Sequence, residues 1–281
     1  MCIRDRYFSD PMKRTDFFTL ANGVTIPAIG FGTWQIPSGD IAYNSVKEAL
    51  KAGYRHIDTA QAYGNEASVG QAILDSGIDR GEIFVTSKLP AEIKSYDQAV
   101  RRIQFTIKKI GLEYIDLYLI HAPWPWDQIG ADYTKENIEV WRAMEEFYET
   151  GKTRSIGISN FNVKDIDAIL ENSRIKPMAN QIKLHIGHPQ LEITEHCRRN
   201  GILVEGYSPL ATGRILINTH IALIAEKYGK SVPQLSVRYV LQKGAVPLPK
   251  STHPEYIRQN IDVDFEITPD DMNYLDAIVT A

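Results

Sequence analysis

The sequence predicts an α/β fold, specifically a (β/α)8 TIM barrel preceded by a β-hairpin. Short β-type runs alternate with amphipathic stretches along the chain, and this alternation favours a parallel sheet with helices between its strands. The chain has 281 residues, 43% of them hydrophobic, which is enough for a large core. A barrel of this length forms one domain, so we expect residues 1–281 to be a single domain. An open doubly wound sheet is the structural alternative.

The first predicted element is the hairpin. The pair Asn22-Gly23 lies between two β-like runs in FFTLANGVTIPAIGFGTW and favours a tight turn. We expect this hairpin to plug the bottom of the barrel. Residues 1–11 before it are expected to be non-native or disordered. MCIRDR back-translates to ATGTGTATAAGAGACAG, which resembles the transposon end used in sequencing libraries, so the natural start is expected nearer Met12.

Eight short runs are the predicted barrel strands, and each is expected to be followed by a helix. No linker, low-complexity segment or long charge block divides the series, which favours one continuous barrel. The last run is the weakest of the eight. In chain order the predicted strands are 54–58, 83–88, 115–121, 154–159, 178–182, 202–208, 245–249 and 261–265.

Helical periodicity and capping residues predict the helices between these strands. Apolar residues recur at helical spacing in SYDQAVRRIQFTIKKIG and in NIEVWRAMEEFYETG. In the first segment, Ser95 and Gln98 form a predicted capping box, and Gly111 is the predicted stop. In TPDDMNYLDAIV, Thr268 is the predicted cap and Pro269 begins the helix.

Composition excludes several classes of function. The formal net charge of −4 gives no electrostatic reason to bind nucleic acid or anionic lipid. No apolar run reaches membrane-spanning length, and the charged start has no apolar signal-peptide core. Two cysteines, Cys2 and Cys197, predict neither a disulfide framework nor a metal cluster, as in a reducing cytosol. The histidines of HIGH (185–188) lack an obvious third ligand, so no metal site is predicted.

Four polar residues lie near the ends of the first three predicted strands. The first strand ends at Asp58, the second at Lys88 and the third at His121, and Tyr63 follows the first strand closely. In such barrels the carboxyl ends of the strands form the active-site face. Taken singly, these residues could be a helix cap, a solvated lysine, a core histidine and a packed tyrosine. Taken together, they predict an active site.

The four residue types suit proton donation to a carbonyl. A free tyrosine has a pKa of about 10 and is a weak acid at neutral pH. A neighbouring ammonium stabilises the tyrosinate and lowers that pKa. Asp58 would hold Lys88 in place and partly cancel its charge, and His121 could orient the carbonyl oxygen. The set therefore predicts Tyr63 as a general acid.

Motifs along nearly the whole chain carry a family resemblance. They are GFGTWQ (30–35), HIDTAQAYGNE, SKL (87–89), DLYLIH, GISNF (157–161), NQI (180–182), YSPL (207–210) and PKS (249–251). With these motifs the chain resembles the aldo-keto reductases, and in particular bacterial enzymes similar to 2,5-diketo-D-gluconate reductase. The resemblance implies a monomeric, cytoplasmic oxidoreductase that reduces aldehydes or ketones to alcohols by hydride transfer from NADPH. It also implies that Asp58, Tyr63, Lys88 and His121 are the catalytic residues.

The same resemblance implies the cofactor contacts. GFGTWQ is not a Rossmann fingerprint, because it lacks the third glycine and lies before the first predicted strand. The nicotinamide would stack on Tyr207, and Lys250 and Ser251 would hold the adenosine 2′-phosphate. The implied cofactor-binding residues are Gly32, Thr33, Ser159, Asn160, Gln181, Tyr207, Ser208, Leu210, Lys250, Ser251, Gln259 and Asn260.

The chain also departs from the family pattern. Tyr256 stands where the family usually has an arginine near the 2′-phosphate, so NADPH is favoured but NADH is possible. HAP (121–123) replaces the usual HWP, and Trp124 or Trp126 would supply the missing pocket tryptophan. Trp34 would form another wall of the substrate pocket, and the family's variable C-terminal loop is expected to be short or missing. Two rival functions are a nucleotide-sensing regulatory subunit and a phosphate-binding sugar isomerase.

Overall fold

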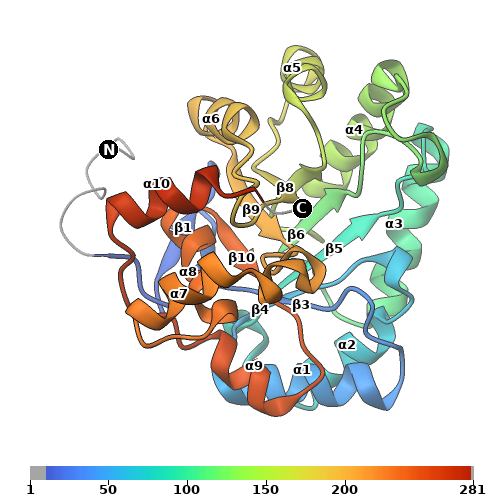
Figure 1. Cartoon of the computed structure of the whole chain (residues 1–281). Helices are drawn as coiled ribbons and strands as arrows, with labels where there is room; N and C mark the ends of the chain where they lie inside the picture. The colour runs from blue at the N-terminus through green and yellow to red at the C-terminus, as the bar shows by residue number, and fades with distance from the viewer. Residues whose placement is uncertain (1–10, 280–281) are drawn as a thin grey trace.

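The computed structural model describes residues 11–279, and these form an α/β barrel (Figure 1). An eight-stranded sheet runs in the order β10-β9-β8-β7-β6-β5-β4-β3, with every neighbouring pair parallel. The predicted fold class is confirmed. Residues 1–10, including Cys2, lie outside the described residues. The strands are β3 (Phe31–Gly32), β4 (His56–Asp58), β5 (Phe84–Leu89), β6 (Leu117–Ile120), β7 (Ile156–Ser159), β8 (Ala179–Lys183), β9 (Leu203–Tyr207) and β10 (Val246–Leu248).

The barrel closes where β3 meets β10. The amide of Gly30 donates to Pro247 O and that of Gly32 to Pro249 O, both at 3.0 Å. The two prolines have no N–H to donate back, so the hydrogen bonds at this seam run in one direction. A Cβ at Gly30 would lie 2.5 Å from a Leu248 side-chain atom and 2.6 Å from His56 Nδ1, so a glycine here leaves room for these two side chains.

One predicted strand is wrong. Residues 261–265 are not a strand, and the missing barrel strand is β3, which the sequence argument places before the barrel. The segment alternates because Ile261 and Val263 are buried while Asp262 and Asp264 are exposed. Its Val263 amide donates locally to Ile261 O, however, and not to a neighbouring strand. β3 has only two residues, which is too short to display strand alternation.

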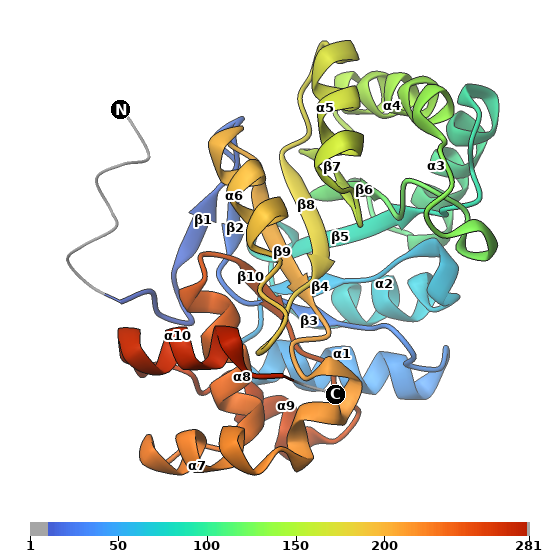
Figure 2. The ribbon, with the colours of Figure 1, turned by 45° about the horizontal axis from the view of Figure 1, so that its top comes forward.

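The predicted hairpin is present and lies at the amino ends of the barrel strands (Figure 2). β1 (Phe17–Thr19) pairs antiparallel with β2 (Thr25–Pro27). The side chain of Asn22 donates to Arg154 O, which lies just before β7, at 2.9 Å. Leu20 and Ile26 are buried in the main hydrophobic core. The hairpin therefore covers the end of the barrel opposite to the carboxyl ends of its strands.

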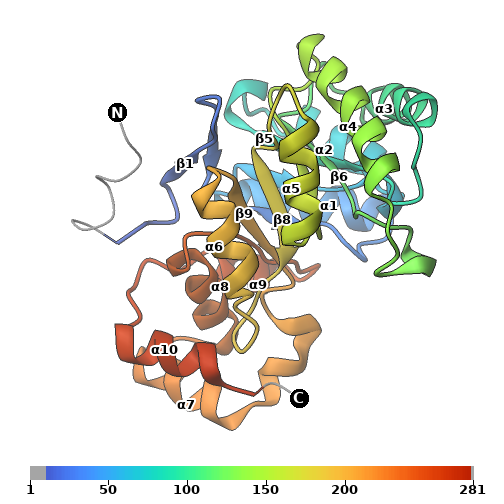
Figure 3. The same ribbon diagram turned by 90° about the horizontal axis from the view of Figure 1, so that it is seen from above.

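Helices follow the strands and cover the outside of the barrel, and α10 lies beside α7 (Figure 3), where Lys227 and Asp271 form an ion pair of 2.7 Å. None of the described helices combines the length and apolarity needed to cross a membrane. The α-helices are α1 (Asp40–Ala52), α2 (Glu66–Leu74), α3 (Tyr96–Ile110), α4 (Thr134–Glu149), α5 (Val163–Asn172), α6 (Leu191–Arg199), α7 (Thr219–Lys227), α8 (Val232–Gln242), α9 (Pro254–Asn260) and α10 (Pro269–Ala277). The 3-10 helices are η2 (Gln61–Tyr63), η3 (Arg80–Glu82), η4 (Trp126–Gln128) and η5 (Ala211–Ile217).

The capping predictions are partly confirmed. Gly111 ends α3 in the left-handed conformation with φ 72°, and Thr268 caps α10 by accepting from the Asp271 amide. The capping box at Ser95 and Gln98 is wrong, because Ser95 precedes α3 without a side-chain capping bond. Capping boxes form instead at the starts of α5 and α8.

Candidate active site

Polar side chains fill two layers of the barrel interior. Residues two apart on a strand point to the same face, so His56 and Asp58 both point inward from β4, and Thr86 and Lys88 do so from β5. His56 Nε2 lies 2.9 Å from Thr86 Oγ1 in the deeper layer. Asp58 and Lys88 meet in the layer at the carboxyl ends of the strands. This layered filling is typical of TIM barrels.

The ammonium of Lys88 is the centre of the outer layer. Lys88 is fully buried, and its Nζ donates to Asp58 Oδ1 at 2.7 Å, to Thr59 O at 3.0 Å and to Tyr63 Oη at 3.3 Å. Burial alone disfavours the ammonium, but Asp58 and Tyr63 together outweigh it and raise the pKa of Lys88. Lys88 is therefore a fixed positive charge beside the Tyr63 hydroxyl.

Tyr63 reaches this layer from η2, which follows β4. Its ring centroid lies 5.0 Å from Lys88 Nζ. Burial raises the pKa of Tyr63 above its ordinary value of 10, while the Lys88 charge acts in the opposite direction. The sequence argument weighs Lys88 against Asp58 but leaves out burial, so the net lowering that it expects for the Tyr63 pKa is wrong. The sequence does not reveal how strongly the hydroxyl is desolvated.

His121 follows β6 and faces Tyr63 edge to face, with ring centroids 5.6 Å apart. Burial, with a contribution from the Lys88 charge, lowers the pKa of His121 to about 3. The imidazole is therefore neutral at physiological pH and carries one N–H donor. Its Nδ1 is buried and has no partner among the described residues. A neutral histidine here can donate a hydrogen bond without acting as the acid.

Aromatic side chains extend outward from His121. Of the two tryptophans considered for the pocket, Trp126 contacts His121, with ring centroids 5.3 Å apart and planes at 89°. Trp124 packs against Trp126 at 5.4 Å, one ring further away. Trp34 follows β3 and is 44% exposed, so it is available for contact with a ligand. The carboxyl end of the barrel thus has an apolar wall next to polar chemistry.

A second polar group spans β7, β8 and β9. Ser159 Oγ donates to Gln181 O at 2.8 Å, and Asn160 Nδ2 donates to His121 O at 2.9 Å. Tyr207 Oη donates to Asn160 Oδ1 at 2.7 Å. Asn160 adopts a left-handed conformation with φ 62°, which asparagine tolerates better than most residues. These bonds fix a polar surface beside the ring of Tyr207.

The amide of Gln181 is oriented by two buried carboxylates. Its Nε2 donates to Asp58 Oδ2 at 2.7 Å and to Glu205 Oε1 at 3.3 Å. The Asp58 carboxylate can only accept hydrogen bonds, so the amide nitrogen must face it. The amide oxygen of Gln181 is then left to accept from a ligand.

Sequence reasoning missed two residues that organise the site. Glu205 is fully buried in β9, and a charged residue within an apolar strand was the available signal. Asn65 is also fully buried; its Nδ2 donates to Thr33 O and Ile36 O, and its Oδ1 accepts from Thr59. Asn65 therefore ties the end of β3 to the end of β4, and nothing in its sequence context distinguishes it from a loop asparagine.

The remaining predicted cofactor residues lie at the same end of the barrel. Gly32 ends β3, and the Thr33 side chain donates to Asp58 O at 2.9 Å. Ser208 follows β9 with φ 49°, and Leu210 lies two residues further on, before η5. Left-handed backbone outside glycine often marks a functional segment.

The region after β10 is open. Lys250 is exposed and makes no ion pair within residues 11–279, and Ser251 Oγ accepts from the His253 amide. Gln259 is exposed near the end of α9, whereas Asn260 is buried with an Oδ1 that no described residue contacts. An unpartnered buried acceptor favours a ligand donor at this position.

Two residues bear on the charge of this region. Tyr256 is 53% exposed and lies edge-on to His253, with ring centroids 5.5 Å apart. Arg258 Nη1 lies 3.5 Å from Glu48 Oε2, so its charge is directed toward α1. Arg258 therefore does not supply the charge that Tyr256 lacks.

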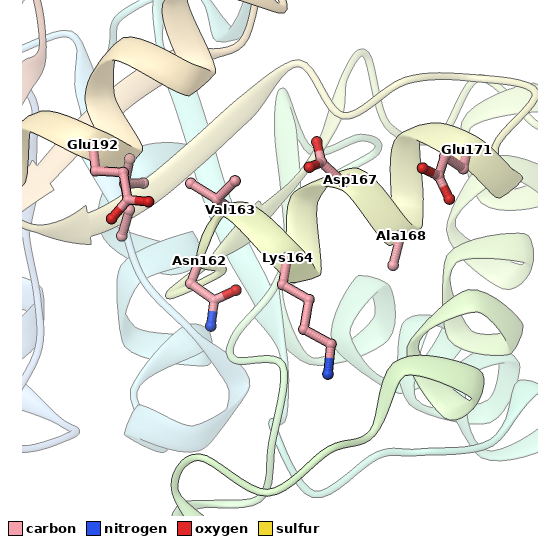
Figure 4. A pocket seen from close by; sticks show the side chains of 8 residues that line it. Asn162, Val163, Lys164, Asp167, Ala168, Glu171 and Glu192 are labelled. Carbon is pink, nitrogen blue, oxygen red and sulfur yellow. The ribbon is translucent and has the colours of Figure 1, made fainter.

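An open groove lies away from these residues. It has a volume of about 750 Å³ and lies between α5 and α6, lined by polar side chains such as Lys164, Asp167 and Glu192 (Figure 4). None of the predicted site residues lines it. His185 and His188 pack together at 5.3 Å, and no cluster of three metal-ligating side chains occurs in the described part of the chain.

Known proteins resemble this chain over almost its whole length. Residues 28–280 match the sequence profile of the aldo/keto reductase family. A Bacillus subtilis (strain 168) protein named glyoxal reductase is 42% identical over 269 residues, covering 95% of this chain and 94% of the relative. A 9,11-endoperoxide prostaglandin H2 reductase of Trypanosoma cruzi (strain CL Brener) is 39% identical, covering 92% of this chain and 90% of the relative.

Solved structures give the same result. An aldo/keto reductase from Brucella melitensis superposes with a TM-score of 0.86 at 40% identity, covering 93% of this chain and 98% of that one. A Bombyx mori aldo-keto reductase in complex with NADP superposes with a TM-score of 0.84 at 37% identity, covering 94% and 93% of the two chains.

Proposed function

The chain belongs to the aldo/keto reductase family, and from this premise we propose that Tyr63 is the general acid of an NADPH-dependent reductase of aldehydes and ketones. The observation that carries the proposal is the contact of one buried ammonium, Lys88, with both Asp58 and Tyr63 beside a neutral His121. These groups lie at the barrel face where such enzymes perform their chemistry.

Each side chain has a distinct task in the proposed reaction. Tyr63 Oη donates its proton to the carbonyl oxygen, and Lys88 at 3.3 Å stabilises the tyrosinate that remains. Asp58 holds Lys88 in place at 2.7 Å. His121, being neutral, donates a hydrogen bond that orients the carbonyl oxygen. A nicotinamide dinucleotide, when bound, would supply the hydride.

Three features of the site fit a nicotinamide dinucleotide. The amide nitrogen of Gln181 faces the Asp58 carboxylate, so its amide oxygen can accept from the carboxamide of the nicotinamide. Asn260 offers a buried acceptor without a partner, which suits the amino group of adenine. Lys250 offers an exposed ammonium for the 2′-phosphate, which supports NADPH over NADH. Tyr256 adds no charge, so the preference depends mainly on Lys250.

The substrate pocket is proposed to lie between Tyr63, His121 and the tryptophan rings. Trp126 against His121 gives an apolar wall one ring away from the acid. The relative named glyoxal reductase supports small carbonyl compounds, including α-dicarbonyls, as substrates. We further propose that the enzyme is a monomer in the cytoplasm, since Cys197 is a buried free thiol, which suits a reducing compartment.

Replacing Tyr63 with phenylalanine tests the function directly. Tyr63→Phe keeps the ring but removes the proton, so we expect single-turnover carbonyl reduction to fall by about 10²–10⁴-fold. The affinity for NADPH, measured by fluorescence titration, should stay within about twofold, because the proposed cofactor contacts lie on other residues, among them Gln181, Asn260 and Lys250. A variant that binds NADPH and reduces glyoxal at near the parental rate would refute the assignment.

A further inference from the structure

Residues 121–126, here named the aromatic loop, connect β6 to η4 and carry both His121 and Trp126. Side chains from three other segments donate hydrogen bonds to its backbone carbonyls. Asn160 Nδ2 donates to His121 O at 2.9 Å, Lys94 Nζ donates to Ala122 O at 2.9 Å, and Asn137 Nδ2 donates to Pro123 O at 2.8 Å. Three consecutive carbonyls are therefore bound by side chains and not by a neighbouring strand.

Lys94 and Asn137 also bind each other. Lys94 Nζ donates to Asn137 Oδ1 at 3.0 Å, so both ends of the Asn137 amide are used. Asn137 lies in α4 and is only 3% exposed, whereas Lys94 lies in the loop between β5 and α3 and is partly buried. Together they form a clamp, here named the Lys94–Asn137 clamp, that joins two outer elements to the aromatic loop.

The environment of Lys94 indicates that its hydrogen bonds are specific and are not chance contacts of a surface side chain. Long charged side chains are seldom buried without a specific partner. No carboxylate lies within ion-pair distance of Lys94 among the described residues, and its bonds go to a backbone carbonyl and a neutral amide. Burial lowers its pKa to about 8, although Glu92, Asp165 and Glu136 act in the opposite direction. The lysine is thus held for its hydrogen bonds.

We infer that Lys94 and Asn137 are positioning residues that keep Trp126 against His121 and thereby determine how well the enzyme binds bulky carbonyl substrates. The inference rests on the proposed function, because His121 and Trp126 are taken as parts of the substrate site. An aromatic aldehyde extends past the reacting carbon and reaches the wall formed by Trp126. Glyoxal has no group to reach that wall, so it should not depend on the clamp.

The test compares a bulky and a small substrate in Lys94→Met. We expect the KM for 4-nitrobenzaldehyde to rise by about tenfold, the lower range for losing a charged hydrogen bond. The kcat for the same substrate, the KM for glyoxal and the affinity for NADPH should each change by less than about twofold. Lys94→Arg, which can still donate to Ala122 O, should recover most of the loss. Lys135→Met, an exposed lysine in α4, is the matched control and should behave like the parent enzyme.

A second measurement needs no turnover. Loosening the aromatic loop should shift the tryptophan emission of Lys94→Met to longer wavelength, and the shift should vanish when Trp126→Phe is the background. Asn137→Leu provides an independent variant of similar size if Lys94→Met is unstable, and it should give the same pattern.

Equal changes for both substrates, or no recovery in Lys94→Arg together with an unshifted emission, would overturn the inference. Failure of the proposed function would look different, because Tyr63→Phe would then remain active whether or not the emission of Lys94→Met shifts.

Discussion

Two lysines at the carboxyl end of the barrel show how differently this protein treats the two ends of its proposed cofactor site. Lys88 is fully buried and has three hydrogen-bond acceptors, including the Asp58 carboxylate at 2.7 Å. Lys250 is exposed and makes no ion pair with any residue that the structure describes. The end proposed for chemistry is assembled before any ligand arrives. At the end proposed for phosphate recognition, the ligand must supply the negative charge that pairs with Lys250.

Physical chemistry explains the difference. Groups that stabilise a transition state act best when they are already oriented in a site without water. A buried charge must then be paired, because an unpaired one is severely destabilising. A lysine that only recognises phosphate has no such need, because water solvates it until the ligand binds. We therefore expect substitutions at Lys88 to affect both folding and chemistry, and substitutions at Lys250 to affect affinity alone.

The largest expected effect comes from Lys88→Met. Without the ammonium, burial and Asp58 both keep the pKa of Tyr63 high, so the phenol becomes a poorer proton donor. We expect single-turnover reduction to fall by about 10³-fold, within the usual range for a positioned acid. Thermal unfolding should also show a loss of about 3–5 kcal/mol, since Asp58 is left as an uncompensated buried charge.

The double variant Asp58→Asn/Lys88→Met separates these two effects. It removes both charges, so stability should recover by more than half of the loss while reduction stays low. Activity that returns together with stability would show that Lys88 matters only for folding. That outcome would contradict the conclusion that Lys88 serves the chemistry as well as the folding of the protein.

Lys250→Ala has a smaller and more selective expected effect. The affinity for NADPH should fall by about ten- to a hundredfold, as for the loss of a charge-assisted contact of roughly 1.5–3 kcal/mol. The affinity for NADH should change by less than about twofold, since NADH has no 2′-phosphate. The melting temperature should not change, because Lys250 is exposed. Fluorescence titrations with both cofactors measure the effect, and equal losses for the two would contradict the role assigned to Lys250.

The catalytic end of the site, formed by Asp58, Tyr63, Lys88 and His121, could be predicted from the sequence better than the rest of the barrel. Asp58, Lys88 and His121 were placed together because each lies at or next to the end of a strong β-type run, and the structure brings them together. Long apolar runs specify strands whose ends are well defined. The two-residue strand β3 has no such run. The alternation in 261–265 arises because Ile261 and Val263 are buried in the same hydrophobic cluster as Ile257 of α9, and not from strand pairing.

The sequence also could not show how deeply the polar side chains of the site are buried or which partners they contact. The net direction of the Tyr63 pKa depends on desolvation, which only the folded structure reveals. Glu205 was not identified because a lone glutamate in ILVEGYS gives no sign that it contacts the Gln181 amide. The Lys94–Asn137 clamp joins residues 43 positions apart, and no periodicity connects them. The assignment of catalytic and cofactor roles stays a prediction.

The smallest expected effect concerns Glu205, the buried carboxyl below the pair formed by Asp58 and Lys88. Burial raises the pKa of Glu205 to about 8 from its ordinary value of 4.5, and Asp58 adds to the effect. Below pH 4.5 the carboxyl is protonated in both the folded and unfolded states, so stability is unaffected. Between pH 4.5 and 8 the folded state holds a proton that the unfolded state releases, and the parent enzyme therefore loses stability as pH rises.

Glu205→Gln removes this titration and keeps an oxygen that can accept from Gln181. At pH 8 the variant should be more stable than the parent by about 1–2 kcal/mol, which is a few degrees in melting temperature. At pH 5 the two should differ much less. Glu66, whose pKa burial raises to about 7, titrates in both enzymes and cancels in the difference. A stability difference between the two enzymes that stays constant from pH 5 to 8 would mean that Glu205 is already ionised in the folded state at pH 5, as it is in the unfolded state. The site around Lys88 would then tolerate a second buried negative charge beside Asp58.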